Sequence, residues 1–164
     1  MTGLVSPPWG GLLTMLALCL AAPLALELGP VPITLQSLII CLGGALAGLA
    51  GVIGVLAWLG LAALGLPVLA GMKGGLAAMG GYSAGFIIAM PLAARLAMRW
   101  RAGWGWQPTL GLMLAAHGLL LALGGAVILW RGGDAGALAI LLPGAVAKSL
   151  IACALLRLVA ARQA

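Results

Sequence analysis

The sequence predicts an all-α integral membrane protein with six transmembrane helices, formed as a single membrane domain over residues 1–164. Hydrophobic residues make up 65% of the chain and charged residues only 6%, whereas a soluble domain carries about a quarter charged residues. The mean hydropathy is +1.27. A chain this short could not hide so much apolar surface in water. The expected surroundings are therefore a lipid bilayer.

Glycine, proline and charged residues divide the apolar sequence into segments of about the length that a membrane helix needs. The expected spans are 9–26, 33–49, 51–66, 76–98, 108–130 and 136–160. The first ends before Glu27, and the second follows the prolines at 30 and 32. The boundary between the second and third falls in "GGALAGLAGVIG", which contains no charge. A five-helix alternative with one long kinked helix therefore remains open.

The last three spans have clearer limits. The fourth follows "KGG" and ends before Arg99, and the fifth lies between "GWGWQ" and Arg131. The sixth begins after "RGGDA". Five tryptophans fall near predicted helix ends, as interfacial aromatic residues do; they are Trp9, Trp100, Trp104, Trp106 and Trp130.

The distribution of basic residues predicts the orientation in the membrane. With six spans, both termini share a side with Arg95, Arg99, Arg101, Arg157 and Arg162. The opposite side receives two basic and two acidic residues, Lys73, Arg131, Glu27 and Asp134. Both termini of this multi-pass protein are therefore expected in the cytoplasm. The first apolar run lacks a preceding basic region and a clear cleavage site, so a removable signal peptide is not expected.

Several classes of function lack the residues that they need. The three cysteines lie inside apolar runs, and no CxxC or HExxH spacing occurs, so neither a metal site nor a cofactor is expected. The few basic residues form no stripe suited to nucleic acid. No nucleophile–base pair or pair of carboxylates can be assembled for an enzyme. Without a GxxxxGK[ST] motif, uphill transport would need ATP hydrolysis by another chain, or an ion gradient.

The stretch "GPVPITLQSL", 29–38, places a polar cluster between two apolar runs. Its prolines suit an extended loop that enters the membrane on the external side. Thr34, Gln36 and Ser37 are then expected in the first turn of the second helix. Thr34 is a helix cap or a ligand contact, and Gln36 favours a ligand contact, because a long amide is costly in a membrane without a partner.

The stretch "GLPVLAGMKGGLAAMGGYSAGF", 65–86, holds seven glycines on the same expected side. So many glycines suit irregular backbone that closely approaches a ligand or another helix. Lys73 lies at its centre, and Tyr82 is the only tyrosine in the chain. Each is either a ligand contact or an interfacial side chain.

The stretch "LLPGAVAKSL" places Lys148 about twelve residues inside the last span. An ionisable group at that depth is a functional candidate, and an anionic ligand group would be a suitable partner. The alternative is a structural lysine, or one whose ammonium reaches the membrane surface. Together the three stretches suit a small, mostly apolar molecule that carries a carboxylate and a few hydrogen-bonding groups. His117 stands alone in the fifth span, where a packed role is more common than that of a base.

Small residues four apart in the first span, Ala17 and Ala21, flatten one face of that helix. Such a face allows another helix to approach closely. The neighbour is either a helix of this chain or a partner subunit.

The elements "GPVPITLQSL", "GLPVLAGMKGGL", "GGYSAGF" and "LLPGAVAKSL", in this order, resemble the BioY family over about 29–150. These proteins are the biotin-specific substrate-binding (S) components of energy-coupling factor (ECF) transporters. The resemblance implies a six-helix bundle in the plasma membrane of a prokaryote. It would capture biotin at the external face and work with a transmembrane coupling subunit and two cytoplasmic ATPases.

The resemblance also assigns residues. It implies that substrate binding draws on the same three stretches, with Lys148 and Tyr82 in matching motifs, and that Ala17 and Ala21 meet the coupling subunit. The sequence departs from the family at Ala145, where an aspartate is usual, and at His117 and Leu121, where asparagine and tyrosine are frequent. The shortened loop before "GGY" is a further departure. His117 is a candidate replacement for part of the lost polar contact.

Three hypotheses follow. The first is a biotin-binding S component, or an S component for another small vitamin-like carboxylate. The second is a stand-alone secondary carrier, which would need membrane acids for ion coupling. The third is a membrane scaffold without transport.

Overall fold

The computed structural model describes residues 7–26 and 32–162. The described chain forms helices and one short antiparallel hairpin, in this order: α1 (Pro7–Leu20), β1 (Ala25–Leu26), β2 (Ile33–Thr34), α2 (Gln36–Ala47), α3 (Leu49–Ala63), the 3₁₀ helix η1 (Ala70–Met72), α4 (Leu76–Met79), α5 (Ala84–Ala97), α6 (Trp106–Trp130) and α7 (Gly136–Ala161). In the hairpin, Ala25 pairs with Thr34 and Leu26 with Ile33. The helical content agrees with the predicted fold class.

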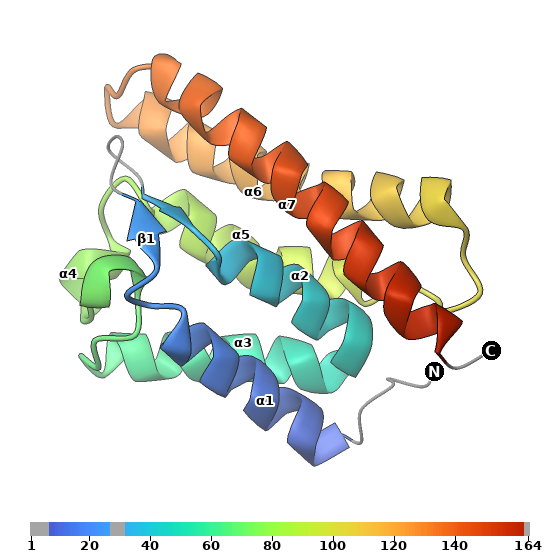
Figure 1. Ribbon diagram of the computed structural model, residues 1–164. Coiled ribbons are helices and arrows are strands. Elements are labelled where there is room, and N and C mark those ends of the chain that lie inside the picture. The colour runs from blue at the N-terminus through green and yellow to red at the C-terminus, as the bar shows by residue number, and fades with distance from the viewer. Residues whose placement is uncertain (1–6, 27–31, 163–164) are drawn as a thin grey trace.

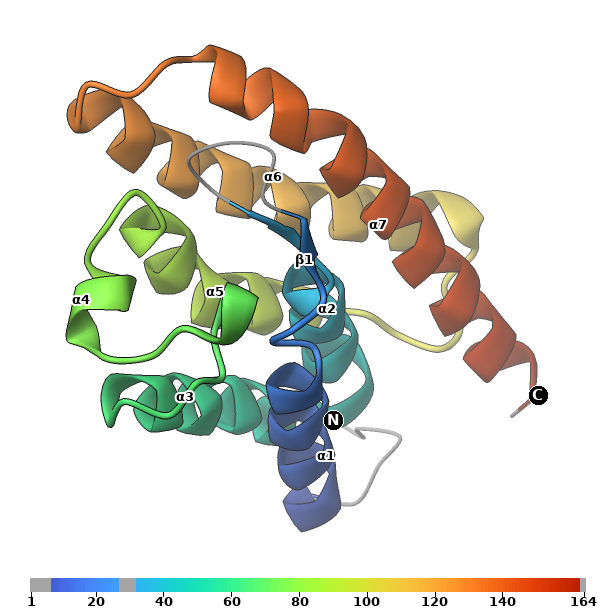
Figure 2. The same cartoon turned by 60° about the vertical axis from the view of Figure 1, so that its left-hand side comes forward.

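The longer helices lie in three layers (Figure 1). α1 packs on α3, α2 packs on α5, and α6 packs on both α5 and α7. The hairpin, α4 and the turn between α6 and α7 lie at one end of the molecule, which Figures 1 and 2 both show. This end is called the hairpin end below. The start of α1 and the end of α7 lie at the opposite end.

Glycines allow the helices of neighbouring layers to approach closely. A Cβ on Gly44 of α2 would collide with the backbone carbonyl of Ala94 in α5. A Cβ on Gly54 of α3 would collide with the carbonyl of Gly11 in α1. Small residues let helix backbones meet in this way and increase their van der Waals contact. The Gly-rich stretch that left a boundary uncertain in the sequence is therefore a packing surface.

Gly48 resolves that boundary. It separates α2 from α3 and adopts φ +60°, a conformation that costs glycine little but strains other residues. The two helices pack against each other instead of continuing as one. The five-helix alternative is therefore wrong, and the second and third helices are separate.

Two predicted helix limits on either side of the hairpin are wrong. The first helix ends at Leu20 instead of 26, and the second begins at Gln36 instead of 33. Pro23 cannot donate a backbone hydrogen bond to a continuing helix. The residues on both sides of 27–31 instead pair as strands, so Thr34 lies in β2 and not in a helical turn.

The predicted fourth span, 76–98, is also interrupted. α4 ends at Met79, and α5 begins at Ala84. Gly80 and Gly81 lie in the break, where their low helix propensity favours a turn. The fifth and sixth spans agree closely with α6 and α7.

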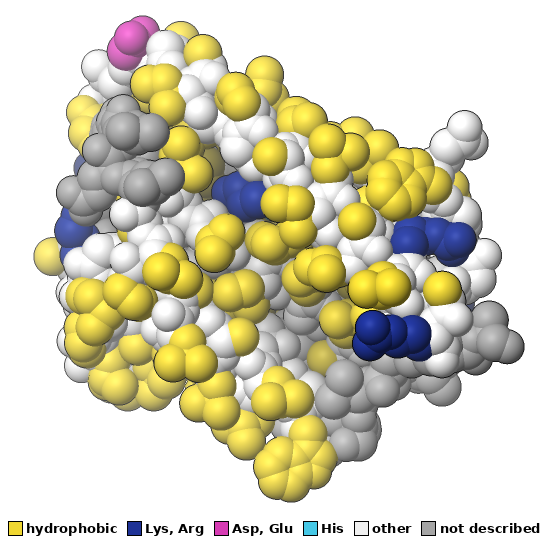
Figure 3. All heavy atoms as spheres, viewed as in Figure 1, with side chains coloured by type: hydrophobic (Ala, Val, Ile, Leu, Met, Phe, Trp, Pro, Cys, Tyr) yellow, Lys and Arg dark blue, Asp and Glu magenta, His cyan; other side chains and the backbone are white. Residues whose placement is uncertain are grey.

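Within the described residues, α6 and α7 are long and apolar enough to cross a membrane, judged by length and composition. Four other apolar helices are shorter: Trp9–Leu20, Gln36–Ala47, Leu49–Ala63 and Ala84–Ala97. At about 1.5 Å per residue, a helix of 12–15 residues rises about 18–23 Å, less than the hydrocarbon thickness of about 30 Å. Hydrophobic side chains cover much of the surface in Figure 3, and basic side chains are few.

Candidate ligand-binding pocket

A cavity of about 270 Å³ opens near the hairpin end, between the hairpin, the loop after α3, and helices α5, α6 and α7. Its walls are mostly apolar, with a few polar groups among them, as is usual for small-molecule sites. The lining residues are Pro32, Ile33, Thr34, Gln36, Ser37, Leu69, Ala70, Lys73, Ala78, Gly81, Tyr82, Ser83, Phe86, Ile87, Met90, His117, Leu120, Leu121, Leu141, Ala145 and Lys148. The three polar stretches of the sequence therefore meet at one site.

Lys148 connects α7 to the hairpin side of the pocket. Its Nζ donates to the backbone carbonyl of Thr34 at 3.0 Å and to the hydroxyl of Ser37 at 2.8 Å. An ammonium has three donors, so one N–H remains for another acceptor. The side chain is half-buried and lines the cavity. Counting partners among residues 7–26 and 32–162 only, this geometry presents a positive charge with one unused donor at the pocket wall.

The loop after α3 is held by two donors on one acceptor. The Nε2 of Gln36 donates to the carbonyl of Val68 at 3.1 Å, and the Nε1 of Trp58 donates to the same oxygen at 2.9 Å. Both side chains are buried, 2% and 0% exposed. We call Gln36, Trp58 and Val68 the loop anchor. The amide N–H of Gln36 therefore supports the loop that carries Lys73.

Further backbone contacts fix the same loop. The N–H of Gly71 donates to Ala22 at 3.0 Å, and the N–H of Gly75 donates to Ala62 at 2.7 Å. These bonds join the loop to the segment after α1 and to the end of α3. Glycine is favoured at 71 and 75, where φ is +67° and +87°, because it adopts positive φ with little strain. The Gly-rich sequence thus builds an irregular but well-bonded wall.

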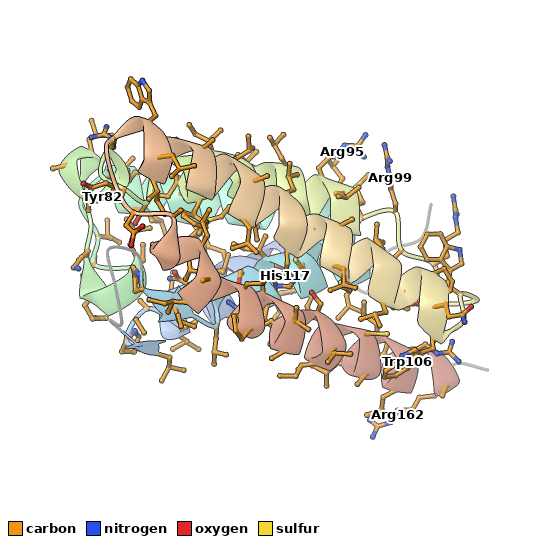
Figure 4. All side chains as sticks on the ribbon, turned by 90° about the horizontal axis from the view of Figure 1, so that it is seen from above. Tyr82, Arg95, Arg99, Trp106, His117 and Arg162 are labelled. Carbon is orange, nitrogen blue, oxygen red and sulfur yellow. The ribbon has the colours of Figure 1, made fainter. Side chains whose placement is uncertain are left out.

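Lys73 and Tyr82 lie at the accessible part of the pocket. Both are exposed, with 38% of the Tyr82 side chain accessible. Figure 4 shows Tyr82 toward one end of the molecule and Arg95, Arg99, Trp106 and Arg162 toward the other. The backbone of Lys73 pairs with Leu69. These two residues can contact the more exposed part of a ligand.

His117 lies between those ends in Figure 4 and is 3% exposed. Its Nδ1 is 3.0 Å from the carbonyl oxygen of Met113 and 3.0 Å from the hydroxyl oxygen of Ser149. The hydroxyl of Ser149 itself donates to the carbonyl of Ala145 at 2.9 Å. Among the described residues, no hydrogen-bond partner exists for the buried Nε2. Contacts at Nδ1 therefore fix the orientation of the imidazole, while Nε2 lacks a hydrogen-bond partner among the described residues.

The structure brings all six predicted substrate-binding residues to one pocket: Thr34, Gln36, Lys73, Tyr82, His117 and Lys148. The helix-cap alternative for Thr34 is wrong, because Leu35 occupies the cap position and no side-chain cap is made. Glu27, named above for topology, lies outside the described residues. The substrate-binding role of these six residues remains a prediction.

The small residues predicted to contact a partner lie away from the pocket. Ala21 is 3% exposed and Ala17 is half-buried. The exposed side of α1 instead carries large residues such as Trp9, Leu13 and Leu20. Burial of Ala21 favours packing within this chain for that residue, and a contact of Ala17 with a partner remains a prediction.

Sequence reasoning missed two residues that shape the pocket. Trp58 was not singled out because it lies inside an apolar run, and its bonding partner is a backbone carbonyl. Ser149 was not noticed because it adjoins the more conspicuous Lys148. A weak signal existed for Trp58, since it is the one tryptophan in the middle of a predicted span. An indole N–H at that depth needs a partner.

A helical bundle with an apolar surface and a partly polar pocket at one end is the architecture expected of a membrane protein with a small-molecule site. Its fold resembles the crystal structure of the S-component for biotin from an ECF-type ABC transporter. The TM-score is 0.81 at 25% identity, over 91% of this chain and 87% of that one. The BioY family model matches residues 9–164, and the chain belongs to the BioY family.

Curated relatives agree with this membership. A probable biotin transporter BioY of Pyrococcus horikoshii is 42% identical over 77 residues, 46% of this chain and 48% of the relative. The biotin transporter BioY of Rhizobium etli is 47% identical over 75 residues, 45% of this chain and 40% of the relative. These two matches span less than half the length of each relative. The biotin transporter BioY of Thermotoga maritima is 34% identical over 119 residues, 70% of this chain and 68% of the relative.

Proposed function

We propose that this chain is the substrate-binding membrane subunit of a biotin uptake system and captures biotin at the external face. The observation that carries the proposal is the pocket in which the three family motifs meet. Membership of the BioY family and the fold shared with a biotin S-component support it. The protein would act as a transporter subunit and not as an enzyme.

Each part of the pocket suits one part of biotin. Apolar side chains such as Phe86, Met90 and Leu121 offer a surface for the ring sulfur and the alkyl chain. The unused N–H of Lys148 offers a charge-assisted hydrogen bond to the carboxylate. Lys73 offers a second cation at the accessible side. Another small vitamin-like carboxylate is the alternative ligand, because Ala145 replaces the family aspartate in the wall.

The proposed setting is a multi-pass arrangement in the plasma membrane of a prokaryote, with six of the helices embedded. The basic residues at the end opposite Tyr82 (Figure 4) would face the cytoplasm, together with both chain termini. The hairpin end, with the pocket, would then face outward. Helices of 12–15 residues fit this arrangement where the bilayer thins locally.

Energy would come from other chains. We propose that an ECF coupling subunit contacts α1 through Ala17 and its neighbours, and that separate cytoplasmic ATPases hydrolyse ATP. A stand-alone secondary carrier has less support, because it would need an acid for ion coupling. Asp134, the one acid among the described residues, is exposed and accepts a hydrogen bond from the N–H of Gly136 at 3.0 Å. It therefore shapes a turn.

Equilibrium binding of radiolabelled biotin to the purified protein in detergent tests the proposal. Saturable binding with a dissociation constant in the micromolar range or below is expected, and desthiobiotin, which keeps the carboxylate and the urea, should compete. Absence of saturable binding at micromolar biotin would exclude biotin as the ligand. Uptake by cells that express this chain with and without an ECF module would then separate an S component from a stand-alone carrier.

A further inference from the structure

The pocket wall contains a buried nitrogen whose chemistry the proposed function leaves unexplained. Among the described residues, Nε2 of His117 is the buried side-chain polar atom without a hydrogen-bond partner. Leaving such a group unpaired in a buried site costs free energy, and buried polar groups are nearly always paired. A ligand in the adjoining cavity can supply the missing partner.

The surroundings of the other ring nitrogen determine what Nε2 can do. A carbonyl oxygen can only accept a hydrogen bond, so the Met113 oxygen, 3.0 Å from Nδ1, requires a proton on Nδ1. Ser149 gives its own hydroxyl proton to Ala145, so its oxygen is also free to accept from Nδ1. The neighbouring thiol of Cys41 is 4.0 Å from the same nitrogen. The Met113 carbonyl therefore selects the tautomer protonated at Nδ1, and the Ser149 oxygen is compatible with it.

Burial favours the neutral imidazole, because a charged form would lose its hydration, and no carboxylate of the described residues adjoins the ring to compensate. The one described acid, Asp134, lies exposed in the turn between α6 and α7. Lys148 lines the same cavity as His117, and a positive charge nearby disfavours a second one. In the neutral ring, Nε2 carries a lone pair and no proton. It can therefore only accept a hydrogen bond.

We infer that His117 selects ligands with an N–H donor, and that Met113 and Ser149 act as positioning residues that hold its Nε2 unprotonated. This inference rests on the proposed function and assigns one group of the ligand to one atom of the protein. For biotin, the donor is one N–H of the urea ring. Because Nε2 is buried in the ligand-free pocket, this contact requires the side chains that cover it to move aside when the ligand binds.

The tautomer can be measured without any ligand. His117 is the only histidine in the sequence, so selective ¹⁵N labelling gives one pair of ring resonances. The protein is purified with an affinity tag that contains no histidine and does not use biotin. We expect a protonated Nδ1 and an unprotonated Nε2. A proton on Nε2 would overturn the inference, whatever the ligand is.

Two cyclic carbamate analogues of biotin, each with one urea N–H replaced by oxygen, test the ligand side. A site built around a hydrogen bond rejects an analogue that lacks the donor. The wild-type protein should bind one of the two isomers at least about tenfold more weakly than biotin, because two lone pairs then face each other. In His117→Leu, the ratio of the dissociation constant of this isomer to that of biotin should fall to about threefold or less. Biotin itself should bind this variant more weakly than the wild-type protein.

Leu114→Ala is the matched control, since Leu114 lies on α6 outside the pocket lining and is 40% exposed. The Leu114→Ala variant should keep the wild-type ratio of the two dissociation constants. Equal binding of biotin and both isomers by the wild-type protein, or an unchanged ratio in His117→Leu, would refute a role for Nε2 in selection. Failure of biotin to bind at all would instead refute the proposed function, and the ¹⁵N result would still decide the tautomer.

Discussion

Lys148 is the residue in which charge, depth and bonding combine most clearly. It lies midway along α7, and two of its N–H groups bond to Thr34 and Ser37. Both partners belong to the segment around the start of α2. The ammonium is therefore positioned before a ligand arrives, which lowers the entropy that binding must overcome.

Replacing Lys148 with methionine should weaken biotin binding by about 10- to 100-fold. The variant removes a charged hydrogen bond worth about 1.5–3 kcal/mol, and each 1.4 kcal/mol corresponds to a factor of ten. Isothermal titration calorimetry in detergent measures the change. Arg131→Met is the matched control, because it removes a basic residue outside the pocket lining, in the turn after α6. Unchanged affinity in Lys148→Met would mean that another group holds the carboxylate.

At the scale of elements, the loop after α3 depends on the loop anchor. Trp58→Phe keeps most of the ring but removes one donor to Val68, and Gln36→Leu removes the other. Each single change should destabilise the loop by about 0.5–1.5 kcal/mol. The double variant should destabilise it by more than the sum, because the Val68 carbonyl then loses both of these donors.

Limited trypsin digestion reports on this loop, because Lys73 offers a cleavage site within it. We expect faster cleavage after Lys73 in each single variant and the fastest cleavage in the double variant, with the site identified by mass spectrometry. Trp130→Phe, a change at a tryptophan that is 80% exposed, should cleave at the wild-type rate. If the double variant also cleaved at that rate, the anchor would not control the loop.

The glycines between layers make a second element-scale prediction. Gly44→Ala should lower the melting temperature, because its Cβ would collide with the backbone of Ala94. Overpacking of this kind costs about 1–3 kcal/mol, and each kcal/mol shifts the melting temperature by about 2–4 °C at this size. Thiol-reactive dye fluorescence can follow unfolding, because Cys41 and Cys153 are buried.

Gly60→Ala serves as the matched variant. Gly60 is also helical, but a Cβ there would meet nothing within 4 Å. Alanine should therefore leave stability unchanged or raise it slightly, because it favours the helix. Equal melting temperatures for the Gly44 and Gly60 variants would contradict the close packing of α2 and α5.

For the whole molecule, the distribution of charge predicts which end faces the cell exterior. Ala135 is an exposed residue between α6 and α7, and Gly103 is an exposed residue between α5 and α6. In intact cells, Ala135→Cys should react with a membrane-impermeant maleimide. Gly103→Cys should react only after permeabilisation. The reverse pattern would place the pocket on the cytoplasmic side.

Much of the fold was predictable from sequence because the relevant signals are local. The extents of α6 and α7 follow from long apolar runs that end at polar turns. The hairpin was missed because two-residue strands carry almost no pattern of their own, and the pairing of Ala25 with Thr34 bridges a gap in sequence. The break between α4 and α5 was missed because glycine also occurs inside membrane helices.

The candidate site was predictable to a similar extent. Isolated polar residues in an apolar chain are conspicuous, which is why Lys148, Gln36 and Lys73 were identified. Their bonding was not predictable, because the partners are mostly backbone carbonyls, such as those of Thr34 and Val68. Every residue carries a backbone carbonyl, so the sequence does not show which carbonyl accepts the hydrogen bond from a given side chain.

The loop anchor has an evolutionary consequence. Its acceptor is a backbone oxygen, so the identity of residue 68 matters only for packing, while Gln36 and Trp58 carry the requirement for donors. Substitutions at residue 68 that keep its packing are therefore compatible with the attachment of the loop to α2 and α3, whereas Gly71 and Gly75 stay constrained by their positive φ. Related chains should therefore vary more at residue 68 than at the two donor positions.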